Sequence, residues 1–313
     1  MSKLISVVII NYNSSKYIKQ LISSLVENER EIISDKKIEV IIVDNNSTKM
    51  DLIELKKLQN IYEFIKIIET KNNNGFGVGN NIGVANCKSE NILFLNADTY
   101  IIGKFIEDCL ISLNKYNIGC VGVKLLNQDL TNQPSCGNFP CLPQYIFEIL
   151  GLYKIKMLFK ITKPLVFSIQ DNIKKQEVDY VSGACLFIKK KTFNIIGGFD
   201  NKFFLYFEET DLCRRVKKIG KKNIIINSNS IVHLGSQVIG EFSEFKAKCF
   251  FESYLMFIDK FKYKDLYLNL YKIIIIEKLF LAKIKKQIYK EKYYEYGFKL
   301  IKSTCMNNKN NLV

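Results

Sequence analysis

The first hundred residues alternate between short apolar runs and segments in which apolar residues recur with helical spacing. The runs "ISVVII", "KIEVIIVDNN", "FIKIIET" and "NILFLNAD" are predicted strands. The segments between them, "SKYIKQLISSLVEN", "KMDLIELKKLQN" and "GFGVGNNIGVANC", are predicted helices, the last with a loop before it. Near-continuous apolar strands joined by helices need both faces of their sheet covered. The order therefore predicts an α/β fold with a mostly parallel central sheet and helices on both faces.

Each of these predicted strands ends in a polar cluster. The clusters are "NYN", "DNNS", "NNN" and "NAD", in chain order. In open α/β sheets, ligands bind outside the carboxyl ends of the strands, which lie at one edge. Four polar clusters at that edge predict a single binding site.

The remainder of the chain changes in composition twice. All four prolines fall between residues 134 and 164, which predicts an irregular insertion with some helix, a lid or an acceptor-side segment. The segment "VDYVSGACLFIKK" then returns to strand character. From Lys246 to Val313 there are fifteen lysines and six acids, and aromatic residues from Phe250 to Phe261 follow helical spacing. This basic, helical segment holds over half of the chain's formal net charge of +15.

The basic segment has two interpretations that the sequence leaves open. Its lysines could hold the protein at an anionic membrane surface, or they could form only a solvated face. No helix-turn-helix, zinc-finger or RNP pattern accompanies the charge, so we expect no nucleic-acid partner. The apolar stretches are too short or too interrupted by charge for a transmembrane helix or a signal peptide. The nine cysteines form no CxxC pair, which favours a reduced compartment, and we expect a cytoplasmic protein.

Three features could carry chemistry. The stretch "LYFEETDLCRR" places Glu208, Glu209 and Asp211 within four residues, either as a helix N-terminus or as the surroundings of a catalytic base. Asn96 and Asp98 follow a predicted buried strand, where the carboxylate could bind a divalent metal or cap a turn. His233, the only histidine, ends the apolar run "KNIIINSNSIVH" at the same predicted edge, as a metal ligand or as a structural residue.

Nucleotide-binding patterns of other classes are absent or misplaced. Gly77, Gly79 and Gly83 follow a predicted strand, but it is not the first strand and the spacing is not GxGxxG, which argues against an oxidoreductase. There is no GxxxxGK[ST] loop. The first strand is followed by "NYNSSKYI" without glycine, unlike the glycine-rich triphosphate loop of nucleotidyltransferases.

Together these motifs resemble those of inverting family 2 glycosyltransferases, which have the GT-A fold. Within that family the chain is most similar to the rhamnosyltransferase-like enzymes of bacterial surface polysaccharide synthesis. Five motifs occur in the family's order over roughly residues 4 to 260: "SVVIINYNSSKYI", "IIVDNNST", "NNNGFGVGNNIG", "LFLNADT" and "VSGACLFIKK…IGGFDNKFFLYFEETDLCRR…H". By resemblance, nucleotide-sugar binding falls to Tyr12, Asn13, Asp44, Asn45, Asn74, Gly75, Asn80, Asn96 and Asp98.

The resemblance also implies a mechanism. Glu209 would be the base, Glu208 and Asp211 would bind the acceptor or orient Glu209, and Mg²⁺ or Mn²⁺ would bind Asp98 near His233. The chain departs from the family pattern twice, with Asn96 in place of the first metal-motif aspartate and Glu209 in place of the usual aspartate base. The domain would span residues 1–245, with a nucleotide-sugar-binding half (1–130) and an acceptor half (131–245), followed by the helical basic segment (246–313).

The implied donor is a dTDP-, UDP- or GDP-linked sugar, and the implied acceptor is a saccharide or a lipid-diphosphate-linked saccharide. For the latter, we expect peripheral contact with the inner face of an anionic membrane. The alternative from another class is a non-catalytic nucleotide-sugar or glycan-binding module on the same fold. Such a module has no need of Glu209, whose presence favours an enzyme.

Overall fold

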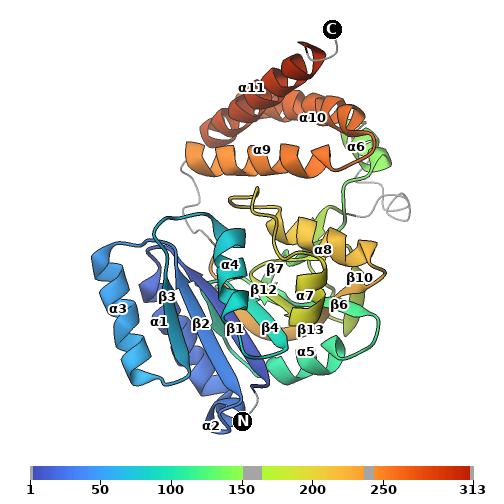
Figure 1. Cartoon of the computed structure of the whole chain (residues 1–313). Helices are drawn as coiled ribbons and strands as arrows, with labels where there is room; N and C mark the ends of the chain where they lie inside the picture. The colour runs from blue at the N-terminus through green and yellow to red at the C-terminus, as the bar shows by residue number, and fades with distance from the viewer. Residues whose placement is uncertain (1–2, 151–163, 236–242, 311–313) are drawn as a thin grey trace. The chain divides into compact units, whose positions relative to one another are not determined.

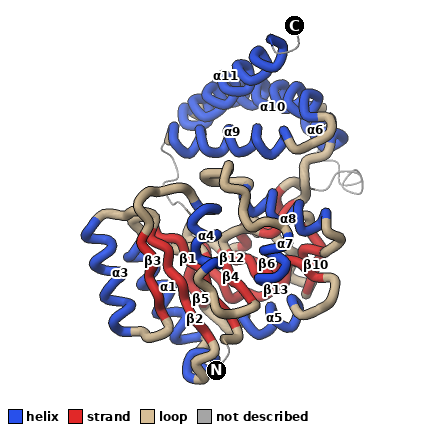
Figure 2. Tube along the Cα trace, viewed as in Figure 1, coloured by secondary structure: helices blue, strands red, loops and turns tan. Residues whose placement is uncertain are grey.

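The structure is a computed structural model that describes residues 3–150, 164–235 and 243–310. It divides into two compact units. The first, here called the sheet unit, comprises Met1–Asn138, Val166–Phe204 and Glu208–Gly235. The second, the helical unit, comprises Phe139–Leu165, Leu205–Phe207 and Ser236–Val313 (Figures 1 and 2). Two segments of the helical unit, and the beginning of its third, thus fall inside the range 131–245.

The sheet unit is built on one twisted sheet whose main path runs β10-β13-β6-β12-β4-β1-β2-β3. Strands β1, β2, β3, β4, β6 and β13 are mutually parallel, and β12 runs against them between β4 and β6. The six parallel strands therefore end at one edge. The strands of the path are β1 (Ile5–Asn11), β2 (Ile38–Asp44), β3 (Ile65–Glu69), β4 (Asn91–Leu95), β6 (Ile118–Leu126), β10 (Lys175–Val178), β12 (Cys185–Lys189) and β13 (Lys222–His233).

Short strands extend this sheet and form a second, smaller one. β5 pairs with the end of β13, β7 pairs with the end of β6, and β8, β9 and β11 make a separate three-stranded sheet. These strands are β5 (Thr99–Ile101), β7 (Asn132–Gln133), β8 (Cys136–Gly137), β9 (Val166–Phe167) and β11 (Tyr180–Val181).

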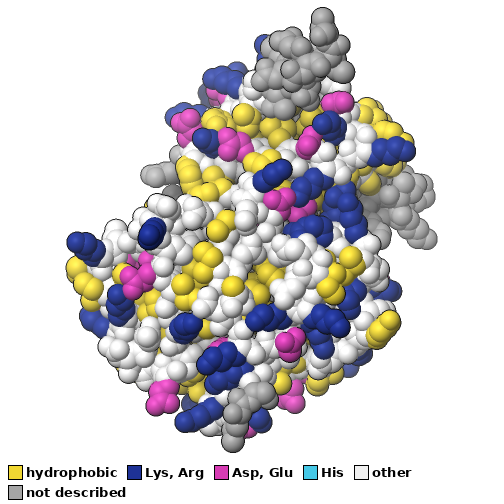
Figure 3. Space-filling view, in the orientation of Figure 1, with side chains coloured by type: hydrophobic (Ala, Val, Ile, Leu, Met, Phe, Trp, Pro, Cys, Tyr) yellow, Lys and Arg dark blue, Asp and Glu magenta, His cyan; other side chains and the backbone are white. Residues whose placement is uncertain are grey.

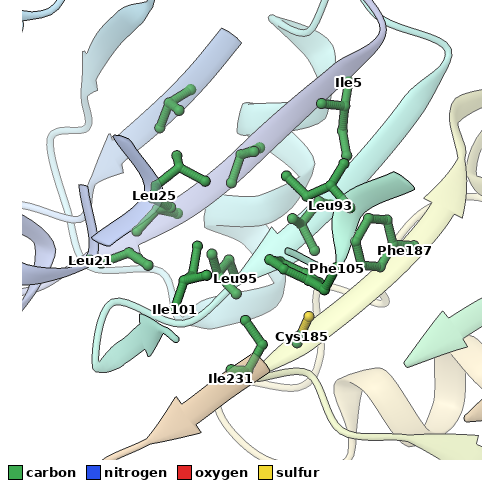
Figure 4. Packing of buried hydrophobic residues seen from close by; sticks show 14 of the residues in the cluster. Ile5, Leu21, Leu25, Leu93, Leu95, Ile101, Phe105, Cys185, Phe187 and Ile231 are labelled. Atoms are coloured by element: carbon green, nitrogen blue, oxygen red, sulfur yellow. The ribbon is translucent and has the colours of Figure 1, made fainter. Parts of the chain in front are cut away.

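Helices cover both faces of the main sheet, as predicted. Alternate residues of β1 point to opposite faces: Val7 and Ile9 join the core under α1, α3 and α5, and Val8 joins the core under α4, α7 and α8. Figure 4 shows side chains of the first core, including Leu25 of α1, packed against the sheet. The helices are α1 (Ser15–Asn28), α2 (Arg30–Ser34), α3 (Lys49–Ile61), α4 (Phe76–Ala85), α5 (Ile106–Leu113), α7 (Lys190–Ile195) and α8 (Glu208–Lys218).

The predicted elements of the first hundred residues are all present, with ends within a few residues of those expected. Helix α1 occupies the predicted range because Ile18, Leu21, Ile22 and Leu25 are buried on one face. Helix α3 begins at Lys49, and the side chain of the preceding Thr48 accepts a hydrogen bond from the Asp51 backbone N–H and caps the first turn. The antiparallel direction of β12 was not foreseen, since the apolar run that forms it carries no sign of direction.

The helical unit contains α6 (Leu142–Ile149), α9 (Glu244–Asp259), α10 (Lys264–Ile284) and α11 (Ile288–Asn310). Its core joins Phe251 of α9, Ile275 of α10 and Ile301 of α11. The ring of Phe207, just before α8, packs with Phe257 in this unit at 5.6 Å between centroids. No helix among the described residues is long and apolar enough to span a bilayer. The Pro-rich insertion is partly helical (α6), its residues 151–163 lie outside the described residues, and its role as a lid stays a prediction.

Gly75 lies in the sheet unit at a position where any side chain would be strained and would meet a backbone atom. Gly75 precedes α4 with φ +89°, and a Cβ there would lie 2.3 Å from the backbone oxygen of Phe204. That oxygen accepts a hydrogen bond from the Phe76 N–H at 2.9 Å, so it cannot move away without losing the bond. The contact fixes the loop before α4 against the segment that leads to α8.

We therefore expect Gly75→Ala to lower the free energy of unfolding by about 2–4 kcal/mol, from left-handed strain together with the backbone clash. Gly197→Ala is the matched control, because Gly197 has φ +79° with no atom near its Cβ position. The control should cost only about 1 kcal/mol. Urea unfolding of the two variants measures the difference, and equal destabilisation would show that the contact with Phe204 carries no weight.

Candidate active site

The ends of β1 and β2 form a rigid polar group. Asn11 and Asp44 are register partners, and the Asn11 Nδ2 donates to Asp44 Oδ1 at 2.7 Å and to Asp51 Oδ2 at 2.7 Å. The Ser47 N–H donates to Asp44 Oδ2 at 3.1 Å. Asp44 is buried, so its carboxylate is held in one orientation by donors on both oxygens. Tyr12, the next residue after β1, is half exposed beside this group.

Asn13 links the two strand-end loops. Its backbone N–H donates to Ser47 Oγ at 2.9 Å, and its Oδ1 accepts from the Thr48 N–H at 2.9 Å. Its φ of 53° is left-handed, a conformation that asparagine tolerates better than most residues. Asn13 therefore positions the loop that carries Tyr12. This structural role does not depend on any contact of Asn13 with a ligand.

The asparagine-glycine loop is fixed to the end of β2. Asn45 is buried, and its Nδ2 donates to the Gly75 carbonyl at 3.0 Å. Asn74 is exposed in this loop. Asn80 lies apart from it, buried within α4, where its Nδ2 donates to the Phe76 carbonyl one turn back. The structure thus brings Asn45, Asn74 and Gly75 together and shows Asn80 in contact with its own helix.

Asp98 and His233 meet because β5 pairs with β13. His233 is the register partner of Thr99, and its Nε2 lies 3.3 Å from Asp98 Oδ1. The two side chains are separated by more than 130 positions in the sequence, and the pairing of the short strand β5, directly after "NAD", with β13 brings them together.

Gln133 determines which ring nitrogen of His233 faces Asp98. Its Nε2 donates to the His233 carbonyl and to Asn127 Oδ1, both at 3.0 Å, so its Oε1 is the acceptor that faces His233 Nδ1 at 2.8 Å. The proton of a neutral imidazole is then on Nδ1, and Nε2 presents a lone pair toward Asp98. A ligating histidine is oriented in this way by a partner on its other nitrogen.

Asn96 completes this group. Its Nδ2 lies 3.3 Å from His233 Nε2, and its buried Oδ1 has no hydrogen-bond partner among the described residues. A buried amide oxygen without a partner is uncommon. Together with a carboxylate and an imidazole nitrogen, it offers the donor atoms that Mg²⁺ or Mn²⁺ accepts. No cluster of three or more His, Cys, Asp or Glu side chains suited to a metal occurs in the described ranges, so a cation here would take further ligands from the substrate or water.

The acidic stretch forms the first turn of α8. Asp211 is fully buried and accepts from Arg215 Nε at 2.7 Å. Arg215 Nη1 in turn donates to the carbonyls of Ile196 and Gly198, each at 2.6 Å. Asp211 therefore ties α8 to the turn after α7, a contact that fits the predicted orienting role better than a contact with the acceptor.

Glu208 and Glu209 are adjacent and differ in their environment. Each has a buried Oε2 without a hydrogen-bond partner among the described residues. Burial raises the pKa of Glu208 well above its ordinary value, and the charge of Glu209 adds to the rise. Burial also raises the pKa of Glu209, while the backbone N–H groups at the start of α8 oppose the rise. Two such neighbours titrate as a pair, so the first ionisation belongs to the pair and not to one residue.

The turn before β12 connects the acidic group with the Asn96 group. A Cβ placed on Gly183 would lie 3.4 Å from the Cβ of Glu209. The neighbouring Ala184 carbonyl accepts from the Asn96 N–H at 3.0 Å. Glu209 and Asn96 therefore approach the same short segment of backbone from two sides, although they lie on different elements.

Some supporting residues were not identified from the sequence. Asn11 belonged to the polar cluster "NYN" and could have been included on that ground. Gln133 lies in the Pro-rich insertion and Gly183 in a turn, and neither has a local pattern that points to His233 or Glu209.

With this geometry, comparison with known proteins places the chain in a family. The family described as Glycosyl transferase family 2 matches residues 6–196, well over half of the chain. The chain therefore belongs to glycosyl transferase family 2, and within it the chain is rhamnosyltransferase-like.

Three relatives support this placement. The chain is 26% identical over 247 residues to the rhamnosyltransferase WbbL of Escherichia coli, covering 74% of this chain and 83% of that protein. It is 23% identical over 248 residues to the N-acetylglucosaminyl-diphospho-decaprenol L-rhamnosyltransferase of Mycobacterium tuberculosis, covering 74% and 76%. It is 26% identical over 232 residues to the low-salt glycan biosynthesis hexosyltransferase Agl10 of Haloferax volcanii. In that case the match spans 73% of this chain and 65% of the relative's length.

Solved structures show the same fold at lower identity. The mannosyltransferase PcManGT from Pyrobaculum calidifontis, in complex with GDP-Man and Mn²⁺, has a TM-score of 0.58 and 11% identity, covering 100% of this chain and 81% of that chain. GalNAc-T7 with UDP, GalNAc and Mn²⁺ has a TM-score of 0.54 and 14% identity, covering 81% and 49%. At this identity the likeness establishes the fold alone, and the predicted GT-A fold is confirmed.

Proposed function

We propose that the protein is an inverting glycosyltransferase that moves a sugar from a nucleoside-diphosphate donor to a saccharide acceptor in glycan synthesis. The observation that carries the proposal is Glu209 at the head of α8. Its Oε2 is buried without a hydrogen-bond partner among the described residues, and its Cβ lies next to the turn that contacts Asn96. Burying such a group without a partner costs stability, and a perturbed carboxylate at a strand-end site is typical of catalysis. A non-catalytic binding module gains nothing from it.

In this reaction Glu209 removes the proton from an acceptor hydroxyl as its oxygen attacks the anomeric carbon of the donor sugar. The bond from that carbon to the diphosphate oxygen breaks on the opposite side, which inverts the configuration. The nucleoside diphosphate leaves with the bonding electrons, and the proton remains on Glu209. Glu208 lies beside the base, and Asp211 positions the helix through Arg215.

Asn96, Asp98 and His233 would hold Mg²⁺ or Mn²⁺. Two observations support a metal at these residues. The buried Asn96 Oδ1 has no hydrogen-bond partner among the described residues, and the hydrogen bond between Gln133 and His233 Nδ1 leaves Nε2 facing Asp98. A divalent cation at this place supplies positive charge that stabilises the departing diphosphate. Two fold neighbours were crystallised with Mn²⁺, which supports the choice of metal.

The strand ends of β1 and β2 would hold the nucleotide. Asp44, fixed by Asn11 and Ser47, presents a carboxylate for the base and ribose, and Tyr12 and Asn13 flank it. Asn45, Asn74, Gly75 and Asn80 form or support the loop on the other side. We retain residues 1–130 as the nucleotide-sugar-binding half, 131–245 as the acceptor half and 246–313 as the helical segment.

Rhamnose or another hexose is the proposed sugar, since two relatives are named as rhamnosyltransferases and one as a hexosyltransferase. One of them acts, by its name, on a diphospho-decaprenol-linked saccharide. A lipid-diphosphate-linked saccharide is therefore the acceptor class that we propose, and the enzyme would work as a cytoplasmic protein at the inner membrane face.

The function is tested by thermal unfolding with dTDP-, UDP- and GDP-sugars, each with and without Mn²⁺. A ligand that binds only the folded protein raises the melting temperature, and we expect one donor class to do so more strongly with Mn²⁺ present. The matching sugar should then be transferred to a lipid-diphosphate-linked saccharide with inversion at the anomeric carbon. ATP and NAD serve as control ligands. Stabilisation by these controls and by none of the nucleotide sugars would overturn the proposal.

A further inference from the structure

Helix α10 is apolar on two opposite faces. Its inner face buries Ile274, Ile275 and Ala282 in the helical unit. Ile273, Ile276, Phe280 and Ile284 are exposed on the other side, at the spacing i, i+3, i+7 and i+11 that defines one stripe of a helix. A single exposed apolar residue needs no explanation, but a continuous stripe of large side chains does.

The stripe continues through the turn into α11. Phe280, Ile284 and Ile288 are 63%, 61% and 68% exposed, and Leu281 and Tyr289 are exposed beside them. The turn is ordered: the Lys286 N–H donates to the Lys283 carbonyl at 3.1 Å and the Gln287 N–H to the Ala282 carbonyl at 2.9 Å, a pattern that closes helix ends. We name residues 280–292 the α10–α11 corner.

The same corner is strongly basic. Its thirteen residues include five lysines and one acid, a net charge of +4. Lys285, Lys286, Lys290 and Lys292 are exposed and form no ion pair among the described residues. Figure 3 shows how Lys and Arg side chains spread over one face of the molecule, where they are more frequent than acids. In the corner this excess charge coincides with the exposed apolar side chains.

We propose that the α10–α11 corner binds the surface of an anionic lipid bilayer, with Phe280, Ile284 and Ile288 entering the interface and the surrounding lysines contacting acidic headgroups. Apolar side chains surrounded by lysines suit such an interface. The apolar side chains leave water when they enter the lipid, and the lysines are attracted to the negatively charged headgroups. A second copy of the chain fits this surface poorly, since a symmetric contact would bring two segments of charge +4 together. The inference rests on the part of the proposed function that places the enzyme at a membrane face, but its test does not depend on sugar transfer.

The absence of tryptophan from the chain permits a direct test. In Phe280→Trp, the new side chain is the only tryptophan, and its emission should shift to the blue when vesicles of phosphatidylcholine with phosphatidylglycerol are added. Vesicles of phosphatidylcholine alone should give little shift. Tyr116→Trp is the matched control, because Tyr116 is 97% exposed in the sheet unit, and its emission should not change.

The charge requirement is tested by co-sedimentation with the same anionic vesicles. Lys285→Gln combined with Lys286→Gln should weaken binding by about 25-fold, since each lysine near a membrane surface contributes about fivefold. Lys16→Gln combined with Lys19→Gln, which removes the same charge from exposed positions of α1, should weaken it less than twofold. Equal losses in the two pairs, equal binding to neutral vesicles, or a dimer that Phe280→Ser dissociates would each overturn the proposal.

Discussion

Glu209→Gln is expected to lower the rate of sugar transfer by about 10²–10⁴-fold, because the amide keeps the size of the side chain but cannot accept the acceptor's proton. Donor affinity should stay within about twofold of wild type, since the donor groups lie on other elements. Single-turnover transfer and titration with the donor measure the two quantities separately. Wild-type transfer by this variant would show that Glu209 is not the base.

The comparison with Glu208→Gln distinguishes the two adjacent glutamates. If Glu209 is the base, Glu208→Gln should cost less activity, because it changes a neighbour of the base and leaves the group that takes the proton in place. The pH profile gives a second criterion. A base acts only when ionised, so wild-type activity should rise with pH through a pKa above the ordinary value of a glutamate. A larger loss for Glu208→Gln would exchange the two roles.

Asp98→Ala is expected to remove the dependence of donor binding on Mn²⁺ and to weaken that binding at least tenfold. The variant loses the carboxylate of the group formed with Asn96 and His233, and a cation bound there loses the one charged ligand that these three residues offer. Calorimetric titration of donor with and without Mn²⁺ measures this without relying on turnover.

Asp35→Ala is the control for this experiment. Asp35 is an exposed carboxylate that pairs with Lys37 just before β2, at the opposite edge of the sheet. The Asp35→Ala substitution removes the same charge at the end of the sheet away from the site, so donor binding should keep its dependence on Mn²⁺. Donor affinity that is unchanged in Asp98→Ala would remove Asp98 from the metal site.

Local pattern was sufficient for the elements that form the sheet. The ranges of α1 and α3 and the apolar strands could be predicted because each depends on neighbours within a few positions. The edge at which Asn11, Asp44, Asn96 and His233 gather also followed from the sequence, since parallel strands must end together. The acidic stretch at the start of α8 was recognisable from its composition.

What depends on distant residues could not be predicted in this way. Contacts between segments far apart in the chain set three such features. They are the antiparallel course of β12, the pairing of β5 with β13 that brings His233 to 3.3 Å from Asp98, and the hydrogen bond to Gln133 that orients the His233 ring. The environments of the three neighbouring acids differ for the same reason. Asp211 pairs with Arg215, whereas Glu208 and Glu209 each keep one buried oxygen without a hydrogen-bond partner among the described residues. The sequence determines which chemical groups are available near a strand end. The packed chain then decides which of those groups are buried and which partners they meet. Burial and partners in turn set the charge state and orientation of each group.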